Sequence, residues 1–411
     1  MPRMRRWKAP VTHARGNGTP FETVALLLQG GGALGAYQAG VYEALAERDI
    51  EPGWIAGISI GAINSAIIAG NAPHARVGQL RRFWEGVSGR STAWAPWLAT
   101  LGLSHLAVNP HLRGAINQMA AGQVLMQGAP GFFSPRLIPP FFQPDKTAEA
   151  TSWYDTSHLY STLESLVDFD RINARQTRFS VGAVNVRTGN FKYFDNAQCT
   201  IRPEHIIASG ALPPGFPAVE VDGEYYWDGG LVSNTPLDWV LSSDSRLDTL
   251  VFQVDLWSAR GHMPGDMAAV ASRMKEIQYS SRTRAATDMF RERQELRNAF
   301  RKLAATMTPE QLASAEGKLL MEATDPARYN IVQMVYQSPN YEGDYKDYEF
   351  SRQTMEDHWR SGYEDAAHTL AQREVLELPT DPSGLAVYDF RRAKGLVPLQ
   401  SRYCPCALTA A

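Results

Sequence analysis

The sequence predicts an α/β fold of three layers, in which helices cover both faces of a mainly parallel sheet. The strand patterns are continuous apolar runs, which suit strands buried on both faces. Near the N-terminus these runs alternate with helical patterns, as in a parallel sheet whose strands are joined by helices. A chain of 411 residues, 44% of them hydrophobic, is also long enough to bury a large core.

The first strand and helix are separated by three glycines. An apolar run at 24–29 leads directly into Gly30, Gly31 and Gly32, and apolar residues at helical spacing follow at 36–48. Glycines between a strand and a helix N-terminus form a site for an anion, or simply a tight turn. A nucleotide site is disfavoured, because the lysine and Ser/Thr of a P-loop are absent.

The second strand and helix surround a serine. A short strand at 54–57 leads into a helix from about Ile60 to Gly70, and Ser59 lies between them in the pattern Gly57-Ile-Ser-Ile-Gly61. This is the nucleophile-elbow pattern, in which flanking glycines remove side chains that would clash at a sharp turn. The stretch 54–72 approaches the length of a membrane span, but its polar residues and its change of pattern favour a strand, a turn and a buried helix.

The composition of the chain changes at about residue 92 and again at about residue 260. Residues 92–153 are rich in aromatic residues, proline and glycine, and their apolar content predicts an ordered cap or lid over a binding groove. After about 260 the sequence becomes charged and mainly helical. Further strands are expected at 178–186, 189–194, 218–221, 224–227 and 250–256, then helices at 266–307 and 310–322, a strand at 329–336 that could join the main sheet, and a helix at 351–373.

Composition excludes several classes of function. A net charge of -3 with 20% charged residues argues against a nucleic-acid partner. The three cysteines, Cys199, Cys404 and Cys406, do not form a disulfide framework, and the last two lack the second cluster that a metal site needs, so we expect a reducing compartment and no metal or cofactor. The basic N-terminus has no apolar segment after it, which disfavours an export signal and favours the cytoplasm.

A base for Ser59 is harder to identify than the nucleophile. The candidate histidines lie in no marked motif: they are His74, His205, His262, His358 and His368. Asp228 ends a predicted strand and is followed by Gly229 and Gly230, where a carboxylate can be held close to another backbone. Burial under a cap would raise its proton affinity toward that of a useful base. Asp222, followed by Gly223, is expected to be a turn residue.

These motifs together resemble the bacterial patatin-like phospholipases. The block 26–35 is similar to the family's glycine-rich oxyanion block, 57–61 to its serine elbow, and 228–230 to its base motif, and 209–217 also occurs in family order. The resemblance covers about 22–258 and implies a patatin-type sheet, a Ser59–Asp228 dyad, amides of Gly30, Gly31 and Gly32 as oxyanion donors, and hydrolysis of lipid acyl esters. Gln29 and Leu34 depart from many relatives, which carry an arginine at the position of Leu34.

Sequence patterns and the resemblance together divide the chain into four parts. Residues 1–20 have no periodicity and are expected to form a mobile basic arm. The resemblance implies a catalytic domain at 21–258 with an insertion at about 92–153 and a mainly helical extension at 259–380, and a tail is expected at 381–411. The basic residues around Trp7 predict peripheral contact with an anionic membrane surface, with an unbound tail as the alternative. Phe132, Phe133, Phe141 and Phe142 are expected to cover the acyl groove, with core packing as the alternative.

Other functions remain to be separated from phospholipase activity. The substrate is expected to be a phospholipid or lysophospholipid, with a polyester or another acyl ester as the alternative. A malonyl-transferase-like enzyme would be expected to carry a histidine where this chain has Ile58. A non-catalytic lipid-binding relative would keep the fold and lose activity.

Overall fold

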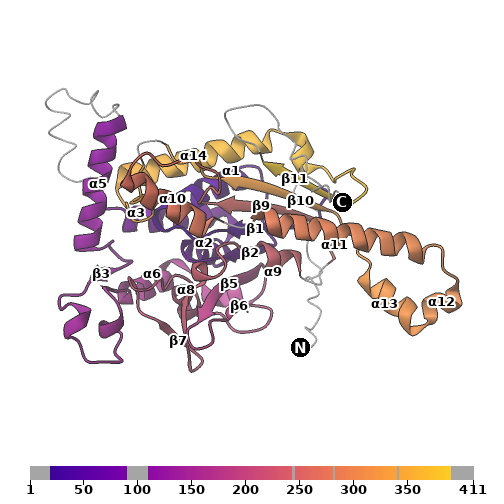
Figure 1. The fold of residues 1–411 in the computed structure, drawn as a ribbon, viewed down its shortest axis with the longest axis horizontal. Helices are drawn as coiled ribbons and strands as arrows, with labels where there is room; N and C mark the ends of the chain where they lie inside the picture. Colours follow the sequence, from indigo (N-terminus) through magenta and orange to yellow (C-terminus); the bar gives the residue numbers. More distant parts are fainter. Residues whose placement is uncertain (1–18, 90–109, 243–245, 281–282, 340–341, 390–411) are drawn as a thin grey trace, which may run out of the picture.

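The three-layer α/β fold is confirmed by a computed structural model that describes residues 19–89, 110–242, 246–280, 283–339 and 342–389 (Figure 1). In this part of the chain one sheet holds nine strands, in the order β11-β10-β9-β1-β2-β5-β8-β7, with β6 paired to β5. The strands from β11 to β5 are parallel, and β6, β7 and β8 run antiparallel at one end. The basic arm around Trp7, Cys404 and Cys406 lie outside the described residues.

With the exception of β11, the strands lie close to the positions that the apolar runs predict. They are β1 (Thr23–Leu28), β2 (Trp54–Gly57), β5 (Arg178–Asn185), β6 (Phe191–Asp195), β7 (Val219–Val221), β8 (Glu224–Asp228), β9 (Thr249–Asp255), β10 (Tyr329–Val335) and β11 (Leu385–Asp389). In β1, Val24, Leu26 and Leu28 pack in one core cluster and Ala25 and Leu27 in another, as the two-residue repeat of a strand requires. Both faces of the sheet are therefore buried.

Helices supply the two outer layers. The larger cluster contains side chains of α1 (Ala36–Ala46), α2 (Ile60–Ala69), α3 (Pro73–Val87), α6 (Ser157–Leu166), α8 (Pro203–Ser209) and α14 (Arg352–Leu370). The smaller cluster, on the other face, contains side chains of α9 (Leu237–Leu241) and α11 (Thr283–Ala304). The remaining helices of the extension are α10 (Met267–Tyr279), α12 (Pro309–Ala313) and α13 (Ala315–Ala323).

The C-terminal extension is part of the same sheet and the same core. Its β10 pairs with β9, and β11 adds a further strand. Its α14 lies along α1 (Figure 1) so closely that a Cβ on Gly362 would lie 1.9 Å from the carbonyl oxygen of Tyr37, and one on Gly40 would lie 1.9 Å from that of Trp359. The two helices cross through glycines because no side chain fits between their backbones.

Three features of this region differ from the sequence-based expectation. The pattern at 266–307 is two helices, because α10 ends at Tyr279 and Ser280 is extended. The pattern at 310–322 is likewise divided, at Ser314, which caps α13. The segment expected to be a tail contains β11, whose short apolar run becomes a strand only because the edge of β10 is available to it.

The insertion contains more regular structure than its composition suggests. Helix α5 (Pro110–Gln127) is followed by the short antiparallel pair β3 (Ser134–Pro135) and β4 (Tyr154–Asp155). Phe132 and Phe133 are buried in an aromatic cluster with Phe216 and Phe350, so core packing, the alternative for these two residues, is observed. Phe141 and Phe142 are 84% and 78% exposed.

No helix in the described ranges is both long enough and apolar enough to cross a membrane. The stretch 54–72, which approaches that length in the sequence, is divided between β2 and α2.

Candidate active site

Ser59 occupies a strained turn between β2 and α2. Its φ of 55° and ψ of -123° are rarely adopted by a residue with a side chain. The turn is tight enough that a Cβ on Gly57 would lie 2.2 Å from the carbonyl oxygen of Gly61, and one on Gly61 would lie 2.2 Å from that of Leu28. Both glycines are therefore required by close backbone contacts, and the serine is presented at the N-terminus of a buried helix.

Asp228 lies beside Ser59 although the two are far apart in sequence. It is the last residue of β8, which pairs with β5, and its carboxyl group lies close enough to the Ser59 side chain for the serine to lower its pKa. The Gly230 amide donates to Asp228 Oδ1 at 2.7 Å. Asp228 is 2% exposed, and burial raises its pKa from 3.8 to about 6, although Ser59 and the Gly230 amide act in the opposite direction.

The glycine loop after β1 lies against the serine. A Cβ on Gly30 would lie 2.9 Å from the Ser59 Cβ, so only glycine permits this approach. The Gly30 amide donates to Asn234 Oδ1 at 3.2 Å and is therefore already hydrogen bonded. Within the described part of the chain, the amides of Gly31 and Gly32 have no protein acceptor. These two donors remain available to a ligand.

Several residues that hold the site in place were missed by the sequence analysis. Ser209 Oγ accepts the Ser59 amide at 3.0 Å and donates to the Gly182 carbonyl at 2.7 Å. Asn234 Nδ2 and Trp257 Nε1 both donate to the Gly30 carbonyl, at 3.1 and 3.0 Å. Ser209 belongs to the block 209–217 that the resemblance singled out, but nothing in the sequence marks Asn234 or Trp257.

The two positions that depart from the family pattern have structural roles. Gln29 is fully buried, and its Oε1 accepts the amides of Leu256 and Trp257 at 2.6 and 3.0 Å. Leu34 is also fully buried in the core beneath the glycine loop. An apolar side chain in that position donates no hydrogen bond, so polar donors near Ser59 come from the backbone.

The candidate histidines are placed elsewhere. His74, His262 and His368 are exposed. Buried His205 packs its ring against Phe194, and buried His358 hydrogen bonds with Glu342 at 2.8 Å. No described histidine forms a hydrogen bond with Ser59.

Asp222 has the position expected of a turn residue. With a φ of 52° it forms the β7–β8 turn together with Gly223, and its exposed side chain accepts from Arg202 at 2.9 Å. This hydrogen bond lowers the pKa of Asp222, in contrast to the raised pKa of Asp228. Only Asp228 is therefore both buried and in contact with the serine.

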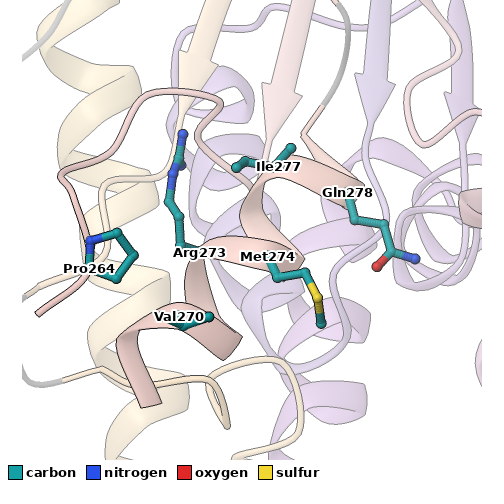
Figure 2. Close-up of a pocket in the computed structure, with 6 residues that line it drawn as sticks. All are labelled: Pro264, Val270, Arg273, Met274, Ile277 and Gln278. Carbon is teal, nitrogen blue, oxygen red and sulfur yellow. The ribbon is translucent and has the colours of Figure 1, made fainter. Parts of the chain in front are cut away.

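A surface groove lies on the extension, away from these side chains. Its volume is about 400 Å³, and Figure 2 shows its lining along α10: Pro264, Val270, Arg273, Met274, Ile277 and Gln278. Neither Ser59 nor Asp228 lines it. Across the described ranges, no three His, Cys, Asp or Glu side chains are grouped so as to hold a metal ion.

Comparisons with known proteins identify the family of the chain. Residues 26–241, more than half of the chain, match the family model for patatin-like phospholipases, and 277–381 match a second model, DUF3734, described as patatin phospholipase. No curated protein matches the chain. Among solved structures, VipD from Legionella pneumophila is 16% identical, with a TM-score of 0.38 over 86% of this chain and 67% of VipD.

Proposed function

The chain belongs to the patatin-like phospholipase family, and from that premise we propose that it hydrolyses lipid acyl esters with Ser59 as nucleophile and Asp228 as general base. The observation that carries the proposal is the position of a buried carboxylate beside the Ser59 side chain. A serine hydroxyl is a weak nucleophile until a neighbouring base accepts its proton. Asp228 is the titratable group in position to do so.

The proposed reaction has two steps. Ser59 Oγ attacks the carbonyl carbon of the ester while its proton passes to Asp228, and the leaving alcohol then takes that proton as the C–O bond breaks. Asp228 next removes a proton from water, the resulting hydroxide attacks the acyl-serine, and Ser59 recovers its proton as the fatty acid leaves. The dyad ends in its starting state.

The raised pKa of Asp228 supports this role. An ordinary aspartate, with a pKa of 3.8, holds a proton too weakly to take one from serine at neutral pH, whereas burial raises this pKa to about 6. The carboxylate is thus still mainly ionised at pH 7 and is a stronger base than a solvated one. Activity should accordingly decline as the pH falls through about 6.

The negative charge on the reacting oxygen needs donors that are already in place. In the described part of the chain the amides of Gly31 and Gly32 have no protein acceptor, and Ser59 lies at the N-terminus of α2, so these groups could bind the oxyanion without losing a hydrogen bond to the protein. Gly30 contributes chiefly through its lack of a side chain, since its amide is bonded to Asn234. We propose the Gly31 and Gly32 amides as the main oxyanion donors.

The dyad is tested with Ser59→Ala and Asp228→Asn. Each should lower kcat for a soluble ester by at least about a thousandfold, and Ser59→Ala should abolish labelling by a fluorophosphonate. Asp222→Asn is the matched control, because it makes the same change on an exposed carboxylate and should leave kcat nearly unchanged. Circular dichroism would confirm that all variants fold.

Two results would contradict the proposal. If alanine at His262, His358 or His368 gave a folded protein as inactive as Ser59→Ala, a catalytic triad would be the better interpretation than a dyad. Folded wild-type protein that binds lipid vesicles but neither reacts with the fluorophosphonate nor hydrolyses any ester would be a lipid-binding relative. A panel of phospholipids, lysophospholipids and other acyl esters identifies the preferred substrate.

A further inference from the structure

The C-terminal extension contacts the glycine loop directly. The Ala33 amide donates to the carbonyl oxygen of Asp347 at 2.8 Å. Gly32, with a φ of 55°, lies so close to this oxygen that a Cβ there would be 2.0 Å from it. The outer side of the loop that holds the free Gly31 and Gly32 amides is thus in contact with the backbone of residue 347, far along the chain.

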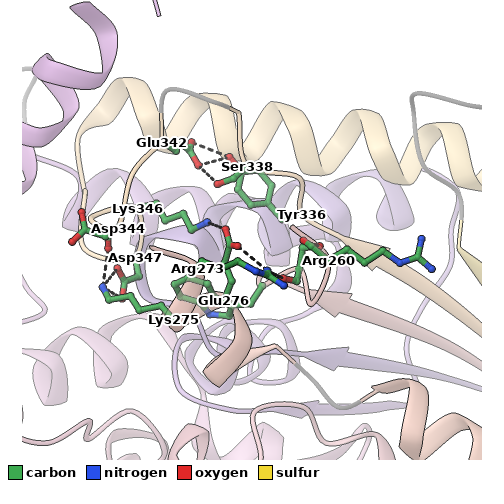
Figure 3. Close-up of polar contacts among 12 residues, drawn as sticks. Arg260, Arg273, Lys275, Glu276, Tyr336, Ser338, Glu342, Asp344, Lys346 and Asp347 are labelled. Atoms are coloured by element: carbon green, nitrogen blue, oxygen red, sulfur yellow. Dashed lines mark hydrogen bonds and ion pairs between the residues drawn. The ribbon is translucent and has the colours of Figure 1, made fainter. Parts of the chain in front are cut away.

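The position of that backbone is fixed by an ion pair. Lys275 Nζ, from α10, lies 2.8 and 3.0 Å from the two carboxylate oxygens of Asp347 and donates to the Asp344 carbonyl at 2.8 Å. Figure 3 shows Lys275 pointing at Asp344 and Asp347. Three hydrogen bonds from one ammonium group therefore hold the segment that carries the Asp347 carbonyl.

Helix α10 is itself anchored at both sides of this contact. Glu276 of α10 binds Lys346 at 2.7 Å, and within the helix it also pairs with Arg273 at 3.0 Å, as Figure 3 shows. At the end of the helix, the Tyr279 carbonyl accepts from Asn234 at 2.8 Å, and Asn234 in turn binds Gly30. The extension thereby contacts both ends of the glycine loop: Tyr279 reaches the start of the loop through Asn234, and Asp347 contacts the end of the loop directly.

We propose that Lys275 is a positioning residue for the glycine loop: through its ion pair with Asp347 it fixes the carbonyl that holds the Ala33 amide, and so orients the Gly31 and Gly32 amides toward Ser59. The inference rests on the proposed function, because it assigns those amides to the oxyanion. A donor of this kind acts on the transition state more than on the bound substrate. Misplacing it should therefore lower kcat and leave KM nearly unchanged.

The test compares three full-length variants. Lys275→Met keeps the length of the side chain without its charge, Lys275→Arg restores a cation, and Arg297→Met removes another ion pair of the extension, Arg297–Asp325 at 3.0 Å, remote from the loop. The side chains of Lys275 and Arg297 are similarly exposed, at 26% and 24%. Kinetics on a soluble ester, the rate of fluorophosphonate labelling and melting temperature are measured for each.

Lys275→Met should lower kcat and the labelling rate by roughly tenfold to a hundredfold with KM within about twofold, as expected when oxyanion donors are misplaced. Lys275→Arg should recover most of the loss, and Arg297→Met should change only the melting temperature. The proposal would be overturned if kcat of Lys275→Met were unchanged. It would also be overturned if Arg297→Met showed the same fall in kcat at an equal loss of melting temperature.

Hydrogen exchange separates this inference from the dyad. In Lys275→Met, the peptide spanning 28–36 should exchange faster than in wild type, with other peptides of the α/β domain unchanged. This readout needs no catalysis. If wild-type protein is inactive but the 28–36 peptide exchanges faster in Lys275→Met, the proposed function is refuted and the structural contact is retained. If wild-type protein is active and exchange in the variant is unchanged, only the positioning role is refuted.

Discussion

Two buried carboxyl groups, one in the α/β domain and one in the extension, have pKa values shifted in opposite directions. Asp228 has a pKa raised by burial, and among the described residues it forms no ion pair. Glu342, whose side chain is 3% exposed, has a lowered pKa, because His358, Ser338 and Tyr336 outweigh the effect of its burial. Burial alone thus raises the pKa of a carboxyl group, whereas hydrogen-bonding and charged partners can lower it below its ordinary value.

The two environments suit two roles. Glu342 accepts from Tyr336 and Ser338 as well as from His358, so its charge is fully compensated and it links β10 to α14. Asp228 accepts from the Gly230 amide, and its other close polar neighbour is the Ser59 side chain. A compensated carboxylate stabilises the fold, whereas a poorly compensated one is available to take a proton.

A large effect on stability is expected for Glu342→Gln. At pH 6 this variant should lose about 3 kcal/mol of unfolding free energy, because His358 is left buried without its anionic partner. On folding the pKa of Glu342 is lowered and that of His358 is raised, so this contribution is lost as the pH falls below 4.5 and also as it rises through the folded pKa of His358. Urea unfolding measures it, with Glu316→Gln on the surface as control. Equal stability of the two variants would contradict the comparison.

The same change in the other region should have the opposite sign. Asp228→Asn should raise the unfolding free energy at pH 7 by up to about 3 kcal/mol, since a pKa raised from 3.8 to about 6 means that ionisation destabilises the folded state. The neutral form of Asp228 carries no such cost, so the gain should shrink as the pH falls through 6 and vanish near 3.8. Urea titrations at several pH values test this. A variant less stable than wild type at pH 7 would show that Asp228 is a structural carboxylate like Glu342.

The smallest effect on stability is expected at the exposed aromatic residues of the insertion. Phe141→Ser should change the unfolding free energy by less than about 0.5 kcal/mol, whereas Phe132→Ser, in the core, should cost about 3 kcal/mol or more. If Phe141 contacts the acyl chain, KM for a long-chain ester should rise by roughly tenfold and that for an acetyl ester should not. Equal changes for both esters would remove Phe141 from the acyl site.

The contrast between the two regions also separates what the sequence predicts from what it does not. The apolar runs of β1, β2, β5 and β9 and the elbow at Ser59 are local patterns, because a buried strand and a tight glycine turn are determined by neighbouring residues. The turn at Asp222 is local in the same way. The two glycines after Asp228 make it a candidate base, but its choice as the base rests on the resemblance, since no local pattern indicates which carboxylate reaches a serine on another strand.

The α/β class, most of the strands and the motifs around Ser59 and Asp228 could therefore be predicted from sequence patterns and the resemblance. Only the folded structure reveals that β11 joins the sheet, that Phe132 is core while Phe141 is exposed, and that Lys275, Asp347 and Asn234 reach the glycine loop. These outcomes depend on which backbone groups lie opposite one another after the chain has folded. A lysine on a charged helix looks the same in sequence whether its ammonium faces water or the carboxylate of a residue 72 positions away.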